Sequence, residues 1–328
     1  MKKLLLVALC VMLAVSMIAC GSESDPVDAG NGGGDDSNGE AFLIALSQEG
    51  LDHPFMTTQR QQIMDAAAAA GNVTVIATDG ENSPLKQVQG IDDMMIQNPD
   101  IIMIQAAQAE PLRPQLAKIE EAGIPYMFVG KPIHGTNAIA LVSMDNYEIG
   151  KNVGEYIVEY LTERNGSPSG NIVIMEGIPG DETSEDRVNG CKEIISEYPE
   201  IVVVSQVAGN YRRPDALSAM QDILQANPVG SIDFVYAANG EMGLGVAQAV
   251  KDANRTGEFA IASVDGDVAS LEAIRDGDMT VAWTYAPCGD FAFELAMQYL
   301  NGGSIDVMNV IPSVRIDINN VDTEPPAF

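Results

Sequence analysis

From residue 41 onward, short apolar runs alternate with longer stretches whose apolar residues recur at helical spacing. The first apolar runs lie at 41–47, 73–77, 101–104 and 125–129, and the helical stretches between them lie at 55–70, 84–97 and 111–122. Strands that are apolar on both faces and separated by helices are typical of a parallel sheet covered on both sides. The pattern therefore predicts an α/β fold.

The same alternation then starts again. Strands are expected at 138–143, 171–175, 201–207, 232–236, 259–264 and 279–284, and helices at 147–164, 184–197, 214–226, 240–253, 267–276 and 288–301. A helix that ends in Asn98-Pro99 precedes one strand, and a helix that ends in Asn227-Pro228 precedes another. This repeat predicts two lobes of like topology, since proline stops a helix at the same point in each.

The first 40 residues have a different composition. Residues 1–19 begin Met1-Lys2-Lys3 and continue as an apolar run too short for a membrane span, which predicts a signal peptide. Met17-Ile18-Ala19-Cys20 resembles the lipobox of bacterial lipoproteins, so we expect lipidation at Cys20; the alternative is an ordinary signal peptide with an incidental cysteine. Residues 20–40 are rich in Gly, Ser and acids, as a flexible tether would be.

Composition excludes several classes of partner and site. A net charge of −30 disfavours nucleic acid, because phosphate contacts need a basic face. Cys191 and Cys288 show no metal-type spacing, and they are expected to be buried free thiols. With only two histidines a His-rich metal site is not expected, and no nucleophile, zinc or phosphate-loop motif appears. We therefore predict no metal, no cofactor and no enzyme activity.

Ligands of open parallel sheets bind at the carboxyl ends of the strands. Aromatic rings in those positions can cover the C–H faces of a sugar, and amide, carboxylate and guanidinium groups can bind its hydroxyls. The candidate ligand-binding residues are His53, Phe55, Gln105, Lys131, Arg187, Tyr211, Asn239, Asp265 and Tyr285. The pattern favours capture of a small sugar or polyol.

Four stretches resemble the type I periplasmic sugar-binding proteins, the group of ribose- and galactose-binding proteins. They are Asp52-His53-Pro54-Phe55-Met56, Glu176–Gly180 with Arg187 ten positions after Gly177, Ala238–Met242, and Ser263-Val264-Asp265-Gly266. The resemblance covers about residues 41–318. It implies two Rossmann-like lobes with parallel sheets and a three-strand hinge, with one lobe from 41–144 plus 287–312 and the other from 145–286 plus 313–328. The hinges would fall near Met144-Asp145, Tyr285-Ala286 and Pro312-Ser313.

The resemblance also implies roles for individual residues. Phe55 and Tyr211 would cover the two faces of the sugar ring, and Arg187 would bind ring and hydroxyl oxygens. Asn239 and Asp265 would bind hydroxyls, and Tyr285 would be a polar ligand residue near a hinge. The chain departs from ribose binders at Gly130-Lys131, where they have Asp-Arg, so ribose is a doubtful ligand. No calcium loop of the kind that galactose binders have is present in the sequence.

Each assignment has a plainer alternative. Phe55 could pack at a helix start, Arg187 could pair with Glu185 or Asp186 on a helix surface, and Asn239 and Asp265 could cap helices or form turns. Tyr211 could be an aromatic at the edge of a lobe.

The resemblance implies an extracytoplasmic, monomeric protein that delivers its ligand to the permease of an ABC importer. A Cys20 lipid would anchor it in the periplasm or on the outer face of a Gram-positive membrane. The same fold serves receptors for chemotaxis or two-component sensing, which the sequence does not distinguish from transport. A hydrolase is less well supported, because acids such as Glu182 and Asp186 suit a helix start. A sugar-responsive repressor would need a DNA-binding domain where residues 1–40 stand.

Overall fold

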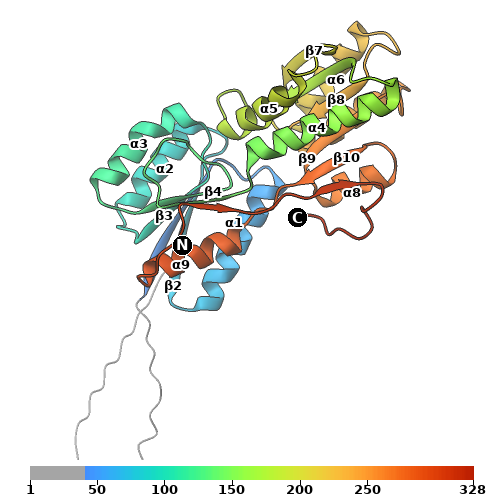
Figure 1. Ribbon diagram of the computed structural model, residues 1–328. Helices are drawn as coiled ribbons and strands as arrows, with labels where there is room; N and C mark the ends of the chain where they lie inside the picture. Colours follow the sequence, from blue (N-terminus) through green and yellow to red (C-terminus); the bar gives the residue numbers. More distant parts are fainter. Residues whose placement is uncertain (1–40) are drawn as a thin grey trace, which may run out of the picture. The chain divides into compact units, whose positions relative to one another are not determined.

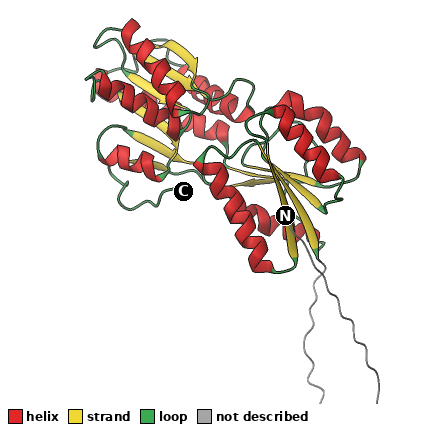
Figure 2. Ribbon diagram, turned by 180° about the vertical axis from the view of Figure 1, so that it is seen from behind, coloured by secondary structure: helices red, strands yellow, loops and turns green. Residues whose placement is uncertain are grey.

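A computed structural model describes residues 41–328 as two α/β lobes (Figures 1 and 2). The predicted signal peptide, tether and Cys20 lie outside the described residues. The first lobe holds a sheet in the order β11-β5-β4-β3-β1-β2, all of it parallel. Its strands are β1 (Phe42–Gln48), β2 (Val73–Asp79), β3 (Ile101–Ile104), β4 (Tyr126–Val129), β5 (Ala140–Ser143) and β11 (Met308–Val310).

The second lobe repeats this arrangement. Its sheet has the order β12-β10-β9-β8-β6-β7, and only the β10–β12 pair is antiparallel. Its strands are β6 (Gly170–Glu176), β7 (Ile201–Ala208), β8 (Phe234–Ala237), β9 (Ala260–Asp265), β10 (Val281–Thr284) and β12 (Arg315–Asp317). The α/β fold with two lobes of like topology, predicted from the sequence, is confirmed.

Helices cover both faces of each sheet (Figure 2). The first sheet is flanked by α1 (Pro54–Ala70), α2 (Pro84–Met95), α3 (Ala109–Glu121) and α9 (Gly289–Leu300). The second is flanked by α4 (Asn146–Asn165), α5 (Glu182–Ile195), α6 (Arg213–Ala226), α7 (Gly240–Asp252) and α8 (Val268–Arg275). No helix within residues 41–328 is long and apolar enough to cross a membrane.

Alternation along the strands explains the two-sided core of the first lobe. Ile44 and Leu46 of β1 pack in one cluster with residues of α1 and α9, while Ala45 faces a second cluster with α2 and α3. In Figure 1 the red helix α9 lies beside the blue helix α1, although they come from opposite ends of the described chain. The C-terminal part of the chain therefore completes the core of the first lobe.

The chain passes between the two sheets three times. The passages lie between β5 and α4, between β10 and α9, and between β11 and β12. Each lobe is thus built from two separate parts of the sequence, and the carboxyl ends of most strands of both sheets lead into the space between them. The exact lobe boundaries remain a prediction.

Observed element bounds differ from the sequence expectations by at most two residues at each end, and β3 matches its expected range. The clearest case is α2, which was expected to continue to residue 97 and ends at Met95. Asn98 adopts a left-handed backbone (φ 49°), and Pro99 disfavours a helical conformation in the residue before it. Trp283 lies buried within β10, as expected of a residue packed in a strand.

Candidate functional site

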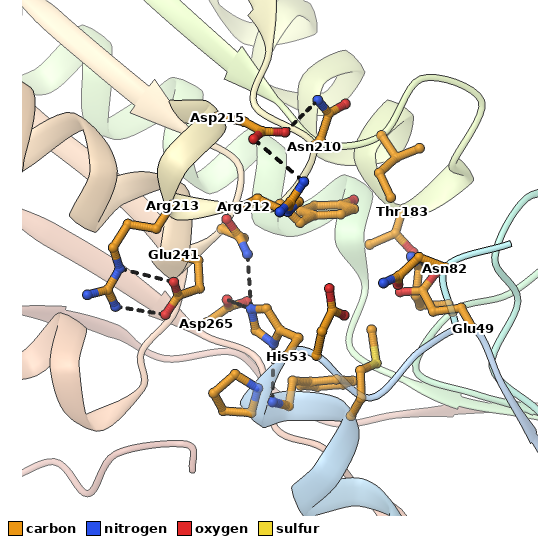
Figure 3. Close-up of a pocket in the computed structure, with 18 of the residues that line it drawn as sticks. Glu49, His53, Asn82, Thr183, Asn210, Arg212, Arg213, Asp215, Glu241 and Asp265 are labelled. Atoms are coloured by element: carbon orange, nitrogen blue, oxygen red, sulfur yellow. Dashed lines mark hydrogen bonds and ion pairs between the residues drawn. The ribbon is translucent and has the colours of Figure 1, made fainter. Parts of the chain in front are cut away.

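A cavity of about 950 Å³ lies between the two lobes. It is lined by residues that follow strands of both sheets, among them eight of the nine candidates from the sequence: His53, Phe55, Lys131, Arg187, Tyr211, Asn239, Asp265 and Tyr285. Figure 3 shows the labelled side chains surrounding this space from several elements. The ninth candidate, Gln105, does not line the cavity; its amide is fully buried and has no hydrogen-bond partner within residues 41–328.

Arg187 occupies the centre of the second-lobe wall. Its Nε donates to Asn146 Oδ1 at 2.9 Å, and its Nη1 donates to the Ala238 carbonyl at 2.6 Å. The guanidinium carbon lies 4.4 Å from the centre of the Tyr285 ring, and Nη1 is 3.9 Å from Asp265 Oδ1. The side chain is 2% exposed, so it does not form the surface pair with Glu185 or Asp186 that the sequence left open.

Close helix packing holds Arg187 in this place. Helices α4 and α5 cross at glycines: a Cβ at Gly190 would lie 2.1 Å from the Tyr147 carbonyl oxygen, and one at Gly150 would lie 2.2 Å from that of Arg187. Such distances leave no room for any side chain, because packed interiors have almost no free volume. The two glycines therefore allow α5 to approach α4 closely enough for Arg187 to reach Asn146.

Asp265 ends β9 with an unusual backbone. Its φ of 110° is rare for a residue with a side chain, and strain of this kind is concentrated at functional sites. Its Oδ2 accepts a hydrogen bond from the Gly240 amide at 3.0 Å. Burial raises the pKa of the Asp265 carboxyl to about 7, against the lowering effect of Arg187. Helix α8 is capped by Asp267, so the capping role that the sequence left open belongs to a neighbour.

Asn239 and His53 connect the lobes beside Asp265. Asn239 caps α7 through Oδ1, which accepts from the Met242 amide, so its alternative as a helix cap is observed. Its Nδ2 lies 3.3 Å from His53 Nε2, and His53 Nε2 in turn lies 4.0 Å from Asp265 Oδ2. His53 caps α1, and burial lowers its pKa. A neutral imidazole at this position adds polarity to the cavity without adding charge.

Aromatic rings form part of the cavity wall. Phe55 stacks on Tyr285 with ring centres 5.3 Å apart, and it also contacts Phe328 edge to face. The Tyr285 hydroxyl donates to the Gly130 carbonyl at 2.5 Å and lies 3.0 Å from the Ser143 hydroxyl. Tyr211 lies close over Gly177, where a Cβ would be 2.2 Å from its ring, so only glycine is accommodated there. Phe55 is thus held by two other rings, and Tyr211 is not a surface aromatic.

Lys131 is in an environment that the sequence did not predict. Its ammonium lies 2.6 Å from Glu49 Oε2 in its own lobe and 2.5 Å from Asp181 Oδ2 across the cavity. All three side chains are buried. Burial lowers the pKa of Lys131, but the two carboxylates together outweigh it and raise that pKa. Burial raises the pKa of Glu49 to about 7, and the neighbouring Asp181 adds to this rise while Lys131 opposes it. Lys131 therefore bridges the two lobes in addition to lining the cavity.

Several lining residues were missed by the sequence reasoning. Arg212 pairs with Asp215 at 3.7 Å and Arg213 pairs with Glu241 at 2.8 Å at the rim, as Figure 3 shows. Glu49 and Thr183 lie deeper. In the sequence, these residues stand out only by their positions directly after a strand or at a helix start. Many surface residues share such positions, so the positions alone do not identify a residue of the cavity.

The thiols and metal-type groups have no part in this site. Cys191 and Cys288 are buried and unpaired within the described residues, which confirms the expectation, and burial raises the pKa of each to about 12. No cluster of His, Cys, Asp or Glu within residues 41–328 has the arrangement of a metal site. The arrangement can therefore bind and orient a polar ligand through hydrogen bonds and ring contacts.

Comparison with known proteins gives a consistent result. The chain is 31% identical to a xylitol-binding protein of Mycolicibacterium smegmatis over 67% of this chain and 61% of the relative. It is 25% identical to the ribose import binding protein of Haemophilus influenzae over 93% and 96% of the two chains. The fructose-binding periplasmic domain of a hybrid two-component system superposes with a TM-score of 0.80 and 28% identity, covering 86% of this chain and 92% of that one.

The family model described as "Periplasmic binding protein domain" matches residues 44–304, most of the chain and both lobes. Members of this family are solute receptors and not enzymes. The chain belongs to the periplasmic binding protein family and has its type I fold.

Proposed function

We propose that this protein captures a neutral sugar or polyol between its two lobes and delivers it to an ABC importer. The observation that supports it best is the pairing of every cation in the cavity. The four Lys and Arg side chains that line it each face a carboxylate of the chain: Lys131, Arg187, Arg212 and Arg213. Among residues 41–328, a ligand with its own negative charge would find no Lys or Arg of the cavity lining without a carboxylate partner, whereas hydroxyl groups can bind to paired charges.

The ligand contacts follow from the geometry. His53, Phe55, Lys131, Arg187, Tyr211, Asn239, Asp265 and Tyr285 are proposed to contact the sugar, with Gln105 held behind the wall of the cavity. Hydrogen bonds to charged groups contribute about 1.5–3 kcal/mol each, so Arg187 and Asp265 would supply much of the polar affinity. The names of the relatives, which bind xylitol, ribose and fructose, agree with a small polyhydroxyl ligand.

We further propose that the protein is a monomer on the outer side of the membrane, anchored by a lipid on Cys20. The motif at Met17–Cys20 and the acidic stretch that follows it support this. Treatment of cells with an inhibitor of lipoprotein processing should cause an unprocessed form to accumulate. Intact-mass analysis that finds an unmodified Cys20 at a mature N-terminus would contradict the anchor.

A thermal-shift screen tests the proposed function. The purified protein is heated with xylitol, D-ribose, D-fructose and a wider set of pentoses, hexoses, polyols and nucleosides. A ligand at 100 times its dissociation constant adds roughly 2.7 kcal/mol to stability, which raises the melting temperature by several degrees. No shift with any neutral member of the set would contradict the proposal.

A receptor that presents its ligand to a signalling partner is the second candidate. The similarity to the fructose-binding domain of a two-component system favours it specifically. The two roles differ in what deletion of the gene does in the native host: a transport role predicts loss of uptake of the labelled sugar, and a sensing role predicts loss of the sugar-induced transcriptional response with uptake retained.

A further inference from the structure

The first-lobe end of the cavity contains a carboxylate that has one unused oxygen. Glu49 follows β1, and its side chain is 6% exposed. Its Oε2 accepts from Lys131 Nζ at 2.6 Å, whereas Oε1 forms no hydrogen bond within residues 41–328. Glu49 nevertheless lines the cavity. Oε1 is not among the fully buried oxygens of the described residues, so it is accessible from the cavity, where a ligand hydroxyl can donate to it.

Within residues 41–328, two hydroxyls in the same part of the cavity lack a well-formed hydrogen bond. The hydroxyls of Thr183 and Tyr211 line the cavity and are buried without a well-formed hydrogen bond among the described residues, although the Ser184 hydroxyl lies near that of Tyr211. Both belong to the same corner: the Thr183 amide donates to Asp181 Oδ1, and the Tyr211 ring centre is 5.1 Å from Lys131 Nζ. Each buried hydroxyl left unpaired costs about 1–3 kcal/mol.

This corner is separate from the Arg187–Asp265 end. In Figure 3, Glu49 and Thr183 lie on the opposite side of the cavity from Asp265 and Glu241. The cavity thus has two polar ends, and the aromatic residues Phe55 and Tyr285 contribute to its wall between the lobes.

We propose that Glu49 contacts the ligand and determines specificity, forming with Lys131 a second polar subsite for two adjacent hydroxyls at the end of the sugar remote from Asp265. This rests on the proposed function and names a residue that neither the motifs nor the relatives assign. The chemistry fits a diol. Lys131 has three N–H donors: one donates to Glu49, a second can face the carboxylate of Asp181, with which the ammonium forms an ion pair, and a third is left over. The third can donate to one hydroxyl oxygen while Glu49 Oε1 accepts from the neighbouring hydroxyl.

A purely structural role for Glu49 makes a different prediction. Glu49 positions Lys131, and Lys131 bridges to Asp181 in the other lobe. If Glu49 acted only through that bridge, its removal would weaken every ligand by the same factor. A direct contact instead weakens only ligands that have the contacted hydroxyl. Monodeoxy sugars separate the two, since each lacks one hydroxyl and otherwise keeps its shape.

The experiment compares Glu49→Gln with Arg113→Ala. Gln keeps the size of the side chain and removes its charge. Arg113 pairs with Glu182 across the lobes at 3.3 Å and also contacts Glu110 and the His134 carbonyl in its own lobe, but it does not line the cavity. Its variant therefore reports the loss of a lobe-to-lobe contact without the loss of a residue that faces the ligand. Calorimetry measures affinity for whichever of xylitol, D-ribose or D-fructose binds the wild type most tightly, and for its monodeoxy or deoxy-alditol analogues.

We expect Glu49→Gln to weaken binding of the parent sugar by about tenfold, in line with the loss of a charge-assisted hydrogen bond. For the one analogue that lacks the contacted hydroxyl, the same substitution should change the affinity by less than about twofold. Arg113→Ala should lower all affinities by one common, smaller factor. A uniform loss across the analogues with Glu49→Gln, or no loss at all, would overturn the inference while leaving the proposed function intact. If none of these three binds the wild type, the neutral ligand that binds most tightly in the thermal-shift screen takes their place. If no neutral ligand of that screen binds, the proposed function fails, and the subsite fails with it.

Discussion

At the scale of single residues, we expect Asp265 to contribute strongly to the affinity for the sugar, because its carboxylate lies in a desolvated site. It is buried, held by the Gly240 amide, and in contact range of Arg187. We expect Asp265→Asn to weaken sugar binding by about tenfold to a hundredfold, since it removes a charged acceptor from a desolvated site. Calorimetry measures the change. Asp222→Asn, at an exposed carboxylate on α6 that does not line the cavity, is the control and should change affinity by less than about twofold. Equal effects of both variants would contradict the assignment.

Protonation of two carboxyls gives a second prediction at this scale. Burial raises the pKa of Glu49 and of Asp265 to about 7, from 4.5 and 3.8. Between about pH 4 and pH 7 these two carboxyls bind more protons in the folded protein than in the unfolded chain. Their contribution to the free energy of unfolding is therefore fully present below about pH 4 and is lost as the pH rises through 7. The unliganded wild type should therefore lose more stability between pH 5 and pH 8 than the Glu49→Gln, Asp265→Asn double variant.

Urea denaturation at several pH values checks this sign. Other carboxyls act in the opposite direction, among them Glu120 and Glu258, whose pKa values are lowered by hydrogen bonds, so the informative quantity is the difference between wild type and variant. Parallel pH profiles for the two proteins would refute the shifts. Sugar affinity should have the opposite sign and weaken below pH 7, because a protonated carboxyl loses its charge-assisted bonds to hydroxyls.

Residue roles were only partly predictable from the sequence. The motifs identified Arg187, Asn239 and Asp265 because each directly follows a strand or lies at a fixed spacing from one. Pairing across the lobes was not predictable: Lys131 finds Asp181 fifty residues later, and nothing local in either segment indicates it. Glu49 was missed for a different reason: a single acid directly after a strand is more often solvated, and its partner Lys131 is 82 residues away in the sequence.

At the scale of elements, the contact of α4 with α5 positions the central guanidinium. We expect Gly190→Ala to destabilise the protein by about 1–3 kcal/mol, because its Cβ would lie 2.1 Å from the Tyr147 carbonyl oxygen and would force the helices apart. Sugar affinity should fall as well, since Arg187 lies one turn earlier on α5. Urea denaturation and calorimetry measure the two effects. Lys192→Ala on the same helix should alter neither, and an undisturbed affinity in Gly190→Ala would show that Arg187 does not depend on this packing.

Elements were more predictable than residues. Apolar runs bounded by turns predicted the strands up to β10 to within a few residues, because burial on both faces of a sheet requires a continuous apolar pattern. The helical spacing of apolar residues predicted the helices equally well. The short edge strands β11 and β12 were foreseen only as strand-like stretches. Each of these strands has three residues and includes an exposed side chain, such as Met308 in β11. They lack a local apolar pattern, so their pairing depends on the sheet that each one joins.

At the scale of the whole molecule, polar contacts connect the two lobes next to the cavity. Arg113 pairs with Glu182, His134 Nε2 lies 3.0 Å from Asp186 Oδ2, and Gln108 Nε2 donates to the Pro179 carbonyl. All three join the first lobe to the start of α5. Ligand binding should add to these contacts and reduce the radius of gyration, which small-angle X-ray scattering can follow. Identical scattering with and without a saturating sugar would mean that binding does not close the lobes.

The central claim is that the cavity selects a neutral polyhydroxyl ligand because its cations are already paired. Isothermal titration calorimetry of the purified protein with a neutral sugar and with the corresponding sugar acid and sugar phosphate tests it most directly. We expect one site per chain for the neutral sugar and affinities at least about a hundredfold weaker for both anions, since an uncompensated buried charge costs several kcal/mol. An anion that binds as tightly as its neutral counterpart, or better, would contradict it.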